Sequence, residues 1–296
     1  MRLGFNGVTT QTADLATDIR VAGQAGYDVI ELCDDKLDQF LAQGSLDDVR
    51  RMLREAGVAV WTINSIERVG VDGAVARCRE LSRYAQAIEC PWVLVVPGPT
   101  DGRTDAQVTS DTVATLREMA DAAAEFGISV AFEFMGFPWA AVRDVAGAWE
   151  IVQEANRPNL GIIVDTAHFY AGGSTLESIR EVDPGRLVVL HINDVEDVAK
   201  PDITDGHRLY PGEGVIPLQD ILGAVRATGW DGVVSVELFR EEYWQQDPLV
   251  VAREAKARTV AAWVRVWRQF MILTRHVRGR WPPNVVLPRP SKIRCN

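Results

Sequence analysis

The feature that most constrains the fold is a regular alternation of short apolar runs with longer amphipathic stretches. Eight runs rich in Val, Ile and Leu follow one another, at residues 3–6, 28–32, 58–64, 92–98, 128–134, 160–166, 187–194 and 232–239. Between them lie stretches of helical periodicity such as TADLATDIRVAGQAG and SLDDVRRMLREAG, several of which end in the glycine that a left-handed helix cap requires. Strands that are apolar almost throughout and alternate with helices predict a parallel sheet covered by helices.

The number of these units predicts a closed barrel. Eight strand–helix units within about 265 residues match an α/β fold of the (β/α)₈, or TIM-barrel, type in count and length. An open doubly wound sheet is the alternative, but the turn after the first strand lacks the glycine-rich phosphate loop of that fold. Nothing interrupts the alternation, so we expect a single barrel domain over residues 1–264.

Charge is divided unevenly between this domain and the C-terminal segment. Residues 265–296 contain eight Arg or Lys and no Asp or Glu, and subtracting their +8 from the net charge of −10 leaves −18 on residues 1–264. A body this acidic repels phosphate backbones, which argues against nucleic acid as its partner. Four prolines and the lack of periodicity predict that the basic segment is disordered or loosely packed. A nucleic-acid or membrane-surface arm remains open for this segment alone.

Other features of the sequence bear on the compartment. No apolar run reaches the roughly 18 residues of a membrane span, and the N-terminus does not resemble a signal peptide. The four cysteines show neither the paired spacing of a metal site nor a disulfide framework. We therefore expect a cytoplasmic protein without a membrane partner.

Polar residues stand at the carboxyl ends of the last four predicted strands, where the active sites of such barrels lie. The runs AFEF, VDTAH, LHIND and VELF place Glu133, Asp165, His191 and Glu237 there among large apolar residues. Any one of them alone could be a helix cap or a hydrogen-bonded core residue. Together, three buried carboxylates would repel one another at a high cost, which a divalent cation would remove. We therefore predict a metal site of three carboxylates and one imidazole.

Two further side chains are expected to face a substrate. His168 would lie over the barrel mouth and donate a hydrogen bond to a substrate hydroxyl, or else be a loop histidine bonded to the backbone. Arg208 lies in the segment DGHRLYPGEG after the seventh strand, where it would bind a substrate oxygen or instead neutralise Asp194.

The motifs FEF, VDTAH, LHIND, R..PGEG and VELF resemble those of the xylose-isomerase-like TIM-barrel superfamily of sugar isomerases, epimerases and AP endonucleases. Longer segments, including GFNGVTT, GYDVIEL, FEFMGFP and VVSVELFREEY, are similar to its inosose isomerase branch, in order over residues 1–264. The basic segment has no counterpart there. The resemblance implies a metal-dependent isomerase that converts 2-keto-myo-inositol to 1-keto-D-chiro-inositol, an enzyme of inositol catabolism and carbohydrate metabolism.

The same resemblance assigns roles to individual residues. It implies one divalent ion, with Mn²⁺ favoured and Zn²⁺ or Co²⁺ compatible with the oxygen-rich ligands. Its ligands would be Glu133, Asp165, His191 and Glu237, and the substrate would contact His168 and Arg208. The reaction would pass through a cis-enediolate, with Glu133 and Glu237 as the catalytic acid and base in an order that the sequence leaves open.

Other branches of the superfamily remain alternatives. Ketose 3-epimerases and inosose dehydratases share the metal and the enediolate. In the AP-endonuclease branch, Asp165, His168, Asp205 and His207 would bind additional zinc ions. That branch needs two more imidazoles where this chain has Asn64 and Val96, and Val96 cannot bind a metal.

The expected partner is a small polyol or keto-sugar, and the oligomeric state is left open. The aromatic residues Trp139, Tyr243 and Trp244, near the strand ends, would line a pocket, form a homo-oligomer contact or simply pack.

Overall fold

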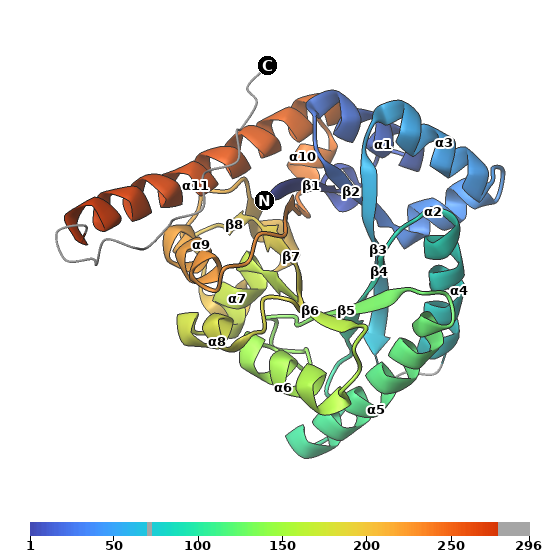
Figure 1. Ribbon diagram of the computed structural model, residues 1–296, viewed down its shortest axis with the longest axis horizontal. Helices are drawn as coiled ribbons and strands as arrows, with labels where there is room; N and C mark the ends of the chain where they lie inside the picture. The colour runs from blue at the N-terminus through green and yellow to red at the C-terminus, as the bar shows by residue number, and fades with distance from the viewer. Residues whose placement is uncertain (70–72, 278–296) are drawn as a thin grey trace, which may run out of the picture.

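The computed structural model describes residues 1–69 and 73–277. Eight parallel strands form a closed barrel with helices around it, which confirms the predicted (β/α)₈ fold (Figure 1). The first strand pairs on both sides, with Gly4 opposite Val29 in one neighbour and Ser235 in the other, and this double pairing closes the sheet.

The eight barrel strands coincide with the eight apolar runs of the sequence. They are β1 (Arg2–Asn6), β2 (Val29–Cys33), β3 (Ala59–Val69), β4 (Trp92–Pro97), β5 (Ser129–Glu133), β6 (Leu160–Asp165), β7 (Leu187–Ile192) and β10 (Val233–Val236). β3 runs past the predicted end at residue 64, because Val69 still pairs with Pro97 of β4. β10 stops short of the predicted end at residue 239, because the N–H of Leu238 is donated to the Thr9 hydroxyl rather than to a neighbouring strand.

Helices connect and cover the strands. They are α1 (Leu15–Ala25), α2 (Asp34–Leu41), α3 (Leu46–Ala56), α4 (Ala74–Ala87), α5 (Asp105–Ala124), α6 (Val145–Ala155), α7 (Thr166–Gly172), α8 (Leu176–Glu181), α9 (Leu218–Ala227), α10 (Glu241–Trp244) and α11 (Pro248–Val277), with 3₁₀ turns η1 (Gly7–Thr10), η2 (Lys200–Asp202) and η3 (Asp205–His207). Capping boxes at Ser45 and Thr104 start α3 and α5. Gly26 and Gly57 end α1 and α3 in the left-handed conformation that the sequence predicts.

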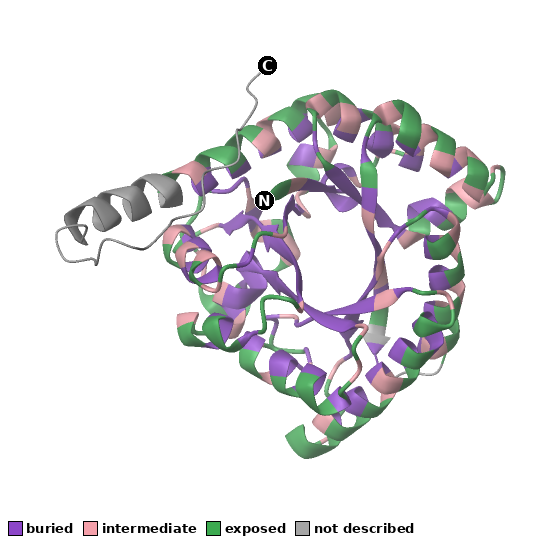
Figure 2. Ribbon diagram, viewed as in Figure 1, coloured by how far each residue is buried: buried purple, intermediate pink, exposed green. Residues whose placement is uncertain are grey.

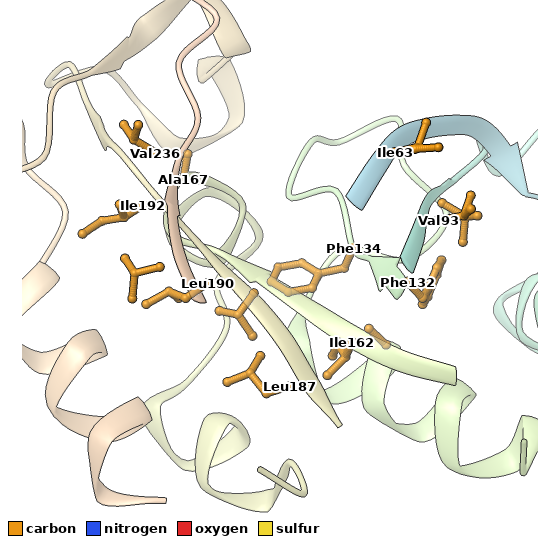
Figure 3. Packing of buried hydrophobic residues seen from close by; sticks show 14 of the residues in the cluster. Ile63, Val93, Phe132, Phe134, Ile162, Ala167, Leu187, Leu190, Ile192 and Val236 are labelled. Atoms are coloured by element: carbon orange, nitrogen blue, oxygen red, sulfur yellow. The ribbon is translucent and has the colours of Figure 1, made fainter. Parts of the chain in front are cut away.

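The apolar core has two parts. The larger one includes Phe132, Ile162 and Leu190, which pack with other buried apolar side chains of the strands and helices (Figure 3). A smaller one, which includes Val29, Leu94, Ala131, Ile163, Val189 and Val233, fills the inside of the barrel, as alternating inward-facing side chains do in this fold. The strands are buried almost throughout, whereas the helices expose their outer sides (Figure 2). The strand ends are therefore held on a rigid scaffold.

Two further elements concern the ends of the domain. After β7, the short strands β8 (Asp194–Val195) and β9 (Arg208–Leu209) form an antiparallel pair. Helix α11 runs to Val277 and therefore crosses the domain boundary predicted after residue 264. That boundary stays a prediction. Residues 278–296 of the basic segment lie outside the described residues. In the described part of the chain, no helix has the length and apolar character that a bilayer crossing requires.

Candidate metal centre

Four barrel strands carry an apolar residue facing inward and, two positions later, a polar one at the carboxyl end. The successive inward positions are Ala131 and Glu133 on β5, Ile163 and Asp165 on β6, Val189 and His191 on β7, and Val233, Ser235 and Glu237 along and just beyond β10. Side chains two residues apart share a face of the strand. The register sets Asp165 and Ser235 on either side of His191. This alternation brings the predicted residues to one level of the barrel.

The four predicted ligands form a compact buried cluster. One ligand atom from each of Glu133, Asp165, His191 and Glu237 lies within 4.8 Å of all the others. His191 Nδ1 is 2.9 Å from Glu133 Oε1 and 3.3 Å from Glu237 Oε2. Among the described residues, this is the one group of three or more such side chains that could hold an ion. Three carboxylates and an imidazole at this spacing fit one divalent cation.

The electrostatics of the cluster separate the two glutamates. Burial, with the charges of Glu237 and Asp165, raises the pKa of Glu133 to about 8 against the opposing effect of His191. Burial also acts to raise the pKa of Glu237, but the positive charges of His191 and Arg208 outweigh it and bring that pKa to about 2. Burial favours neutral His191, yet the surrounding glutamates hold its pKa well above the usual value. Positive charge is thus strongly favoured at the centre of the cluster.

Arg208 supplies part of that charge. Its Nη1 atom donates to Asp165 Oδ2 and to Glu237 Oε2, both at 2.8 Å, and Nη2 lies 2.9 Å from Asp205 Oδ1. The side chain is 1% exposed. The alternative that Arg208 neutralises Asp194 is wrong, because Asp194 instead accepts hydrogen bonds from backbone N–H groups, including that of Gly212.

His168 is placed by the acid that precedes it. Asp165 Oδ1 accepts the backbone N–H of His168 at 2.8 Å and so caps α7, while Oδ2 faces Arg208. Asp165 therefore caps α7 and belongs to the buried cluster at the same time. A guanidinium can only donate, so the 3.1 Å contact from Arg208 Nη2 makes Nε2 of His168 the acceptor. Burial lowers the pKa of His168, and its neutral ring then carries the proton on Nδ1, which has no hydrogen-bond partner among the described residues.

The cluster lies at one wall of a cavity of about 950 Å³ at the carboxyl ends of the strands. Of the four clustered residues, Glu133 and Glu237 line this cavity, and His168 and Arg208 line it beside them. Asp165 and His191 are not among the lining residues and are both fully buried. The two glutamates are thus the members of the cluster that a substrate could touch.

The predicted aromatic residues separate into two groups. Trp139 is 49% exposed and lines the cavity. Trp244 donates its indole N–H to the carbonyl of Val8, and Tyr243 stacks on Tyr210, so these two side chains pack within the domain.

The positions that an AP endonuclease would use do not form a second cluster in the described part of the chain. Asp205 pairs with Arg208, and His207 Nδ1 accepts the backbone N–H of Thr204. Val96 lies in the cavity wall as an apolar residue.

Three polar residues of the site were missed by reasoning from the sequence. Glu31 on β2 is fully buried, and its Oε1 atom lies 3.1 Å from His191 Nε2. Asn6 donates to Glu237 Oε1 at 2.8 Å, and Asn193 donates to Asp165 Oδ2 at 2.6 Å. The signal was available for Glu31, since the run DVIEL also has an acid between two apolar residues, Ile30 and Leu32.

Comparison with known proteins agrees with this geometry. A model of the family described as xylose isomerase-like TIM barrel matches residues 19–267. Inosose isomerase of Halalkalibacterium halodurans is 31% identical over 88% of this chain and 95% of its own length. Inosose isomerase of Bacillus subtilis (strain 168) is 32% identical over 88% of this chain and 97% of its own.

Solved structures extend the agreement to three dimensions. The crystal structure of the IOLI protein with a binding zinc atom has a TM-score of 0.86 and 31% sequence identity. The match covers 90% of this chain and 99% of that one. The chain belongs to the xylose isomerase-like TIM barrel family.

Proposed function

We propose that this chain is a divalent-metal-dependent isomerase that moves a ketone to the adjacent carbon of a cyclic polyol, converting 2-keto-myo-inositol to 1-keto-D-chiro-inositol. The observation that carries the proposal is that Glu133 and Glu237, alone in the buried cluster, line the cavity. Similarity to inosose isomerases over 88% of the chain supports the choice of substrate.

The reaction needs one group to remove a proton from the carbinol carbon and one to return a proton to the former carbonyl carbon. Glu133 and Glu237 are suited to this, because they reach the cavity from different strands and their pKa values are driven apart by their surroundings. They are the proposed acid/base pair. The carbon-bound proton moves to one carboxylate, and the ring carbon that loses its carbonyl receives a proton in exchange. The hydroxyl proton of the carbinol passes to the former carbonyl oxygen, so that the atoms balance.

His168 and Arg208 are the proposed substrate contacts. The Nδ1–H of His168 is a buried donor with no partner among the described residues, in a side chain that lines the cavity. A substrate oxygen would satisfy it, and an unsatisfied buried donor is otherwise costly. Arg208 also lines the cavity beside Glu237, where its positive charge would stabilise the negative charge that develops on a substrate oxygen.

The proposed metal ligands are Glu133, Asp165, His191 and Glu237. A divalent cation held by them would supply Lewis-acid stabilisation of the charge that develops on the substrate oxygens. The donor set accepts Mn²⁺, which we favour, as well as Zn²⁺ or Co²⁺. The zinc atom in the related IOLI structure shows that at least one relative binds a transition-metal ion.

The decisive experiment is an NMR time course in D₂O with a panel of inososes and ketohexoses. Purified protein is first treated with a chelator and then supplied with Mn²⁺, Zn²⁺ or Co²⁺. We expect conversion of 2-keto-myo-inositol with uptake of solvent deuterium at carbon, loss of this activity after chelation, and recovery on addition of metal.

Each different result would redirect the assignment. Epimerisation of a ketohexose without turnover of any inosose would identify a ketose 3-epimerase, and loss of water to a diketone would identify an inosose dehydratase. Full activity after complete removal of metal would contradict the proposed metal dependence.

A further inference from the structure

Glu31 lies on the side of the His191 ring opposite the proposed metal site. His191 Nδ1 faces Glu133 and Glu237, whereas Nε2 is 3.1 Å from Glu31 Oε1 and 3.2 Å from Oε2. The two ring nitrogens of an imidazole point in different directions. Glu31 therefore cannot share the ligand position of Glu133 and Glu237, and it is not part of their cluster.

The carboxylate of Glu31 is held in place by the strand beside it. The Thr62 hydroxyl donates to Glu31 Oε2 at 2.7 Å, and strand pairing sets Thr62 directly opposite Glu31. Glu31 is fully buried, and among the described residues it forms no ion pair with Lys or Arg. Its hydrogen bonds in that part of the chain go to Thr62 and to His191.

We propose that Glu31 is a positioning residue for the metal centre: it accepts the Nε2–H of His191, and so orients the ring with the Nδ1 lone pair toward the ion. The buried carboxylate of Glu31 has only the Thr62 hydroxyl and His191 as hydrogen-bond partners among the described residues. A buried carboxylate is costly without donors, so it favours a proton on the histidine nitrogen that it faces. Histidine ligands commonly donate their second N–H to such a carboxylate, which fixes the tautomer and makes the ligand more basic. This inference rests on the proposed function, since it assumes that His191 binds the metal.

The first test measures affinity for Zn²⁺ alone, by competition with a chromogenic chelator. We expect Glu31→Gln to weaken binding about 10- to 100-fold, because outer partners of metal ligands have effects of that size. Thr62→Val, which removes the hydroxyl that contacts Glu31 at 2.7 Å and Asn64 Oδ1 at 3.3 Å, should cause a smaller loss. The matched control is Glu150→Gln on the exposed side of α6, which should bind zinc as the unmodified protein does.

The second test reads the protonation of His191 directly, first in the unmodified protein. In zinc-loaded protein labelled with ¹⁵N-histidine, the four histidines give few ring signals. We expect His191 to carry its proton on Nε2, with the downfield proton shift of a strong hydrogen bond, and Glu31→Gln to move that signal upfield. Simple loss of packing would change stability but would not change which nitrogen is protonated.

The outcomes separate this inference from the proposed function. Failure of the unmodified protein to bind zinc or another divalent ion would overturn the proposed function and this inference with it. Normal zinc binding that Glu31→Gln leaves unchanged would overturn the inference alone. A proton on Nδ1 in the zinc-loaded protein would do the same, even if Glu31→Gln does not fold.

Discussion

The inside of the barrel has two layers that differ in composition although the same strands build them. The lower layer contains Val29, Ala131, Ile163, Val189 and Val233, and two residues further along the same strands stand Glu31, Glu133, Asp165, His191 and Ser235. Both layers are almost completely buried. The lower layer gains stability from apolar burial, whereas the upper layer removes charged groups from water at a cost.

The difference shows how the barrel divides stability from function. Side chains in the lower layer pack together as one buried apolar cluster, and their contribution follows from size and fit. In the upper layer, every charged group depends on a specific partner, as Glu31 does on His191 and Asp165 on Arg208. Changes in the two layers should therefore have different consequences for stability and for activity.

The largest effect is expected from Glu133→Gln in the upper layer and from Glu237→Gln, whose side chain joins the same cluster from just beyond β10. Each change removes a proposed acid/base group that lines the cavity, so kcat on 2-keto-myo-inositol should fall about 10²- to 10⁴-fold. The fold should survive in both variants. In metal-free protein, Glu133→Gln should leave the Tm level or raise it, because burial already disfavours the charge of Glu133, whereas Glu237→Gln should lower the Tm, because Arg208 loses one of its buried carboxylate partners. Steady-state kinetics and thermal unfolding measure the two effects.

The exposed Glu150→Gln on α6 is the control for these substitutions and should alter neither quantity. Full activity in both Glu133→Gln and Glu237→Gln would show that the acid/base pair has been assigned incorrectly.

Ile163→Ala in the lower layer should produce the opposite pattern. Ile163 is fully buried, and truncation leaves a cavity, so the free energy of unfolding should fall by about 2–5 kcal/mol. At a temperature where the variant remains folded, its zinc affinity should match that of the unmodified protein, because Asp165 keeps its partners. Urea unfolding measures the loss, and Val250→Ala, at a side chain 56% exposed, is the matched control. A strong loss of zinc affinity in Ile163→Ala would mean that the layers are not independent.

The contrast between layers also explains what could be predicted from the sequence. Eight apolar runs determine the number of strands, and parallel strands bring their carboxyl ends together, so Glu133, Asp165, His191 and Glu237 could be predicted to meet. Their individual contacts could not be predicted. Glu31 and His191 are 160 residues apart, and only the closed barrel shows that they face each other.

Strand ends and loop contacts could not be predicted from the sequence either. β10 ends early because Leu238 donates to Thr9, a residue at the opposite end of the chain. The partners of Arg208 depend on how the segment after β7 folds back, and no periodic pattern specifies the path of such a loop.

The smallest effect on catalysis is expected from a change at Asp194, which pairs with Leu209, the residue after Arg208. Its carboxylate accepts the backbone N–H groups of Val195, Gly212 and Ile216 at 2.9–3.0 Å, and β8 and β9 pair beside it. In Asp194→Asn, one acceptor oxygen becomes an NH₂ group that faces an N–H donor. Loss of a charged hydrogen bond should lower the free energy of unfolding by about 1.5–3 kcal/mol, as measured in urea.

The effect of Asp194→Asn on catalysis should be weaker than that of either glutamate substitution. Arg208 is also held by Asp165 and Glu237, so a loosened loop leaves its guanidinium largely in place. We expect a rise in KM of less than about tenfold with kcat nearly unchanged, because the loop bears on how the substrate is held rather than on proton transfer. Asp197→Asn, at an exposed position of the same segment, is the control. A fall in kcat as large as that of Glu237→Gln would show that the upper layer depends on this loop and not on its own contacts.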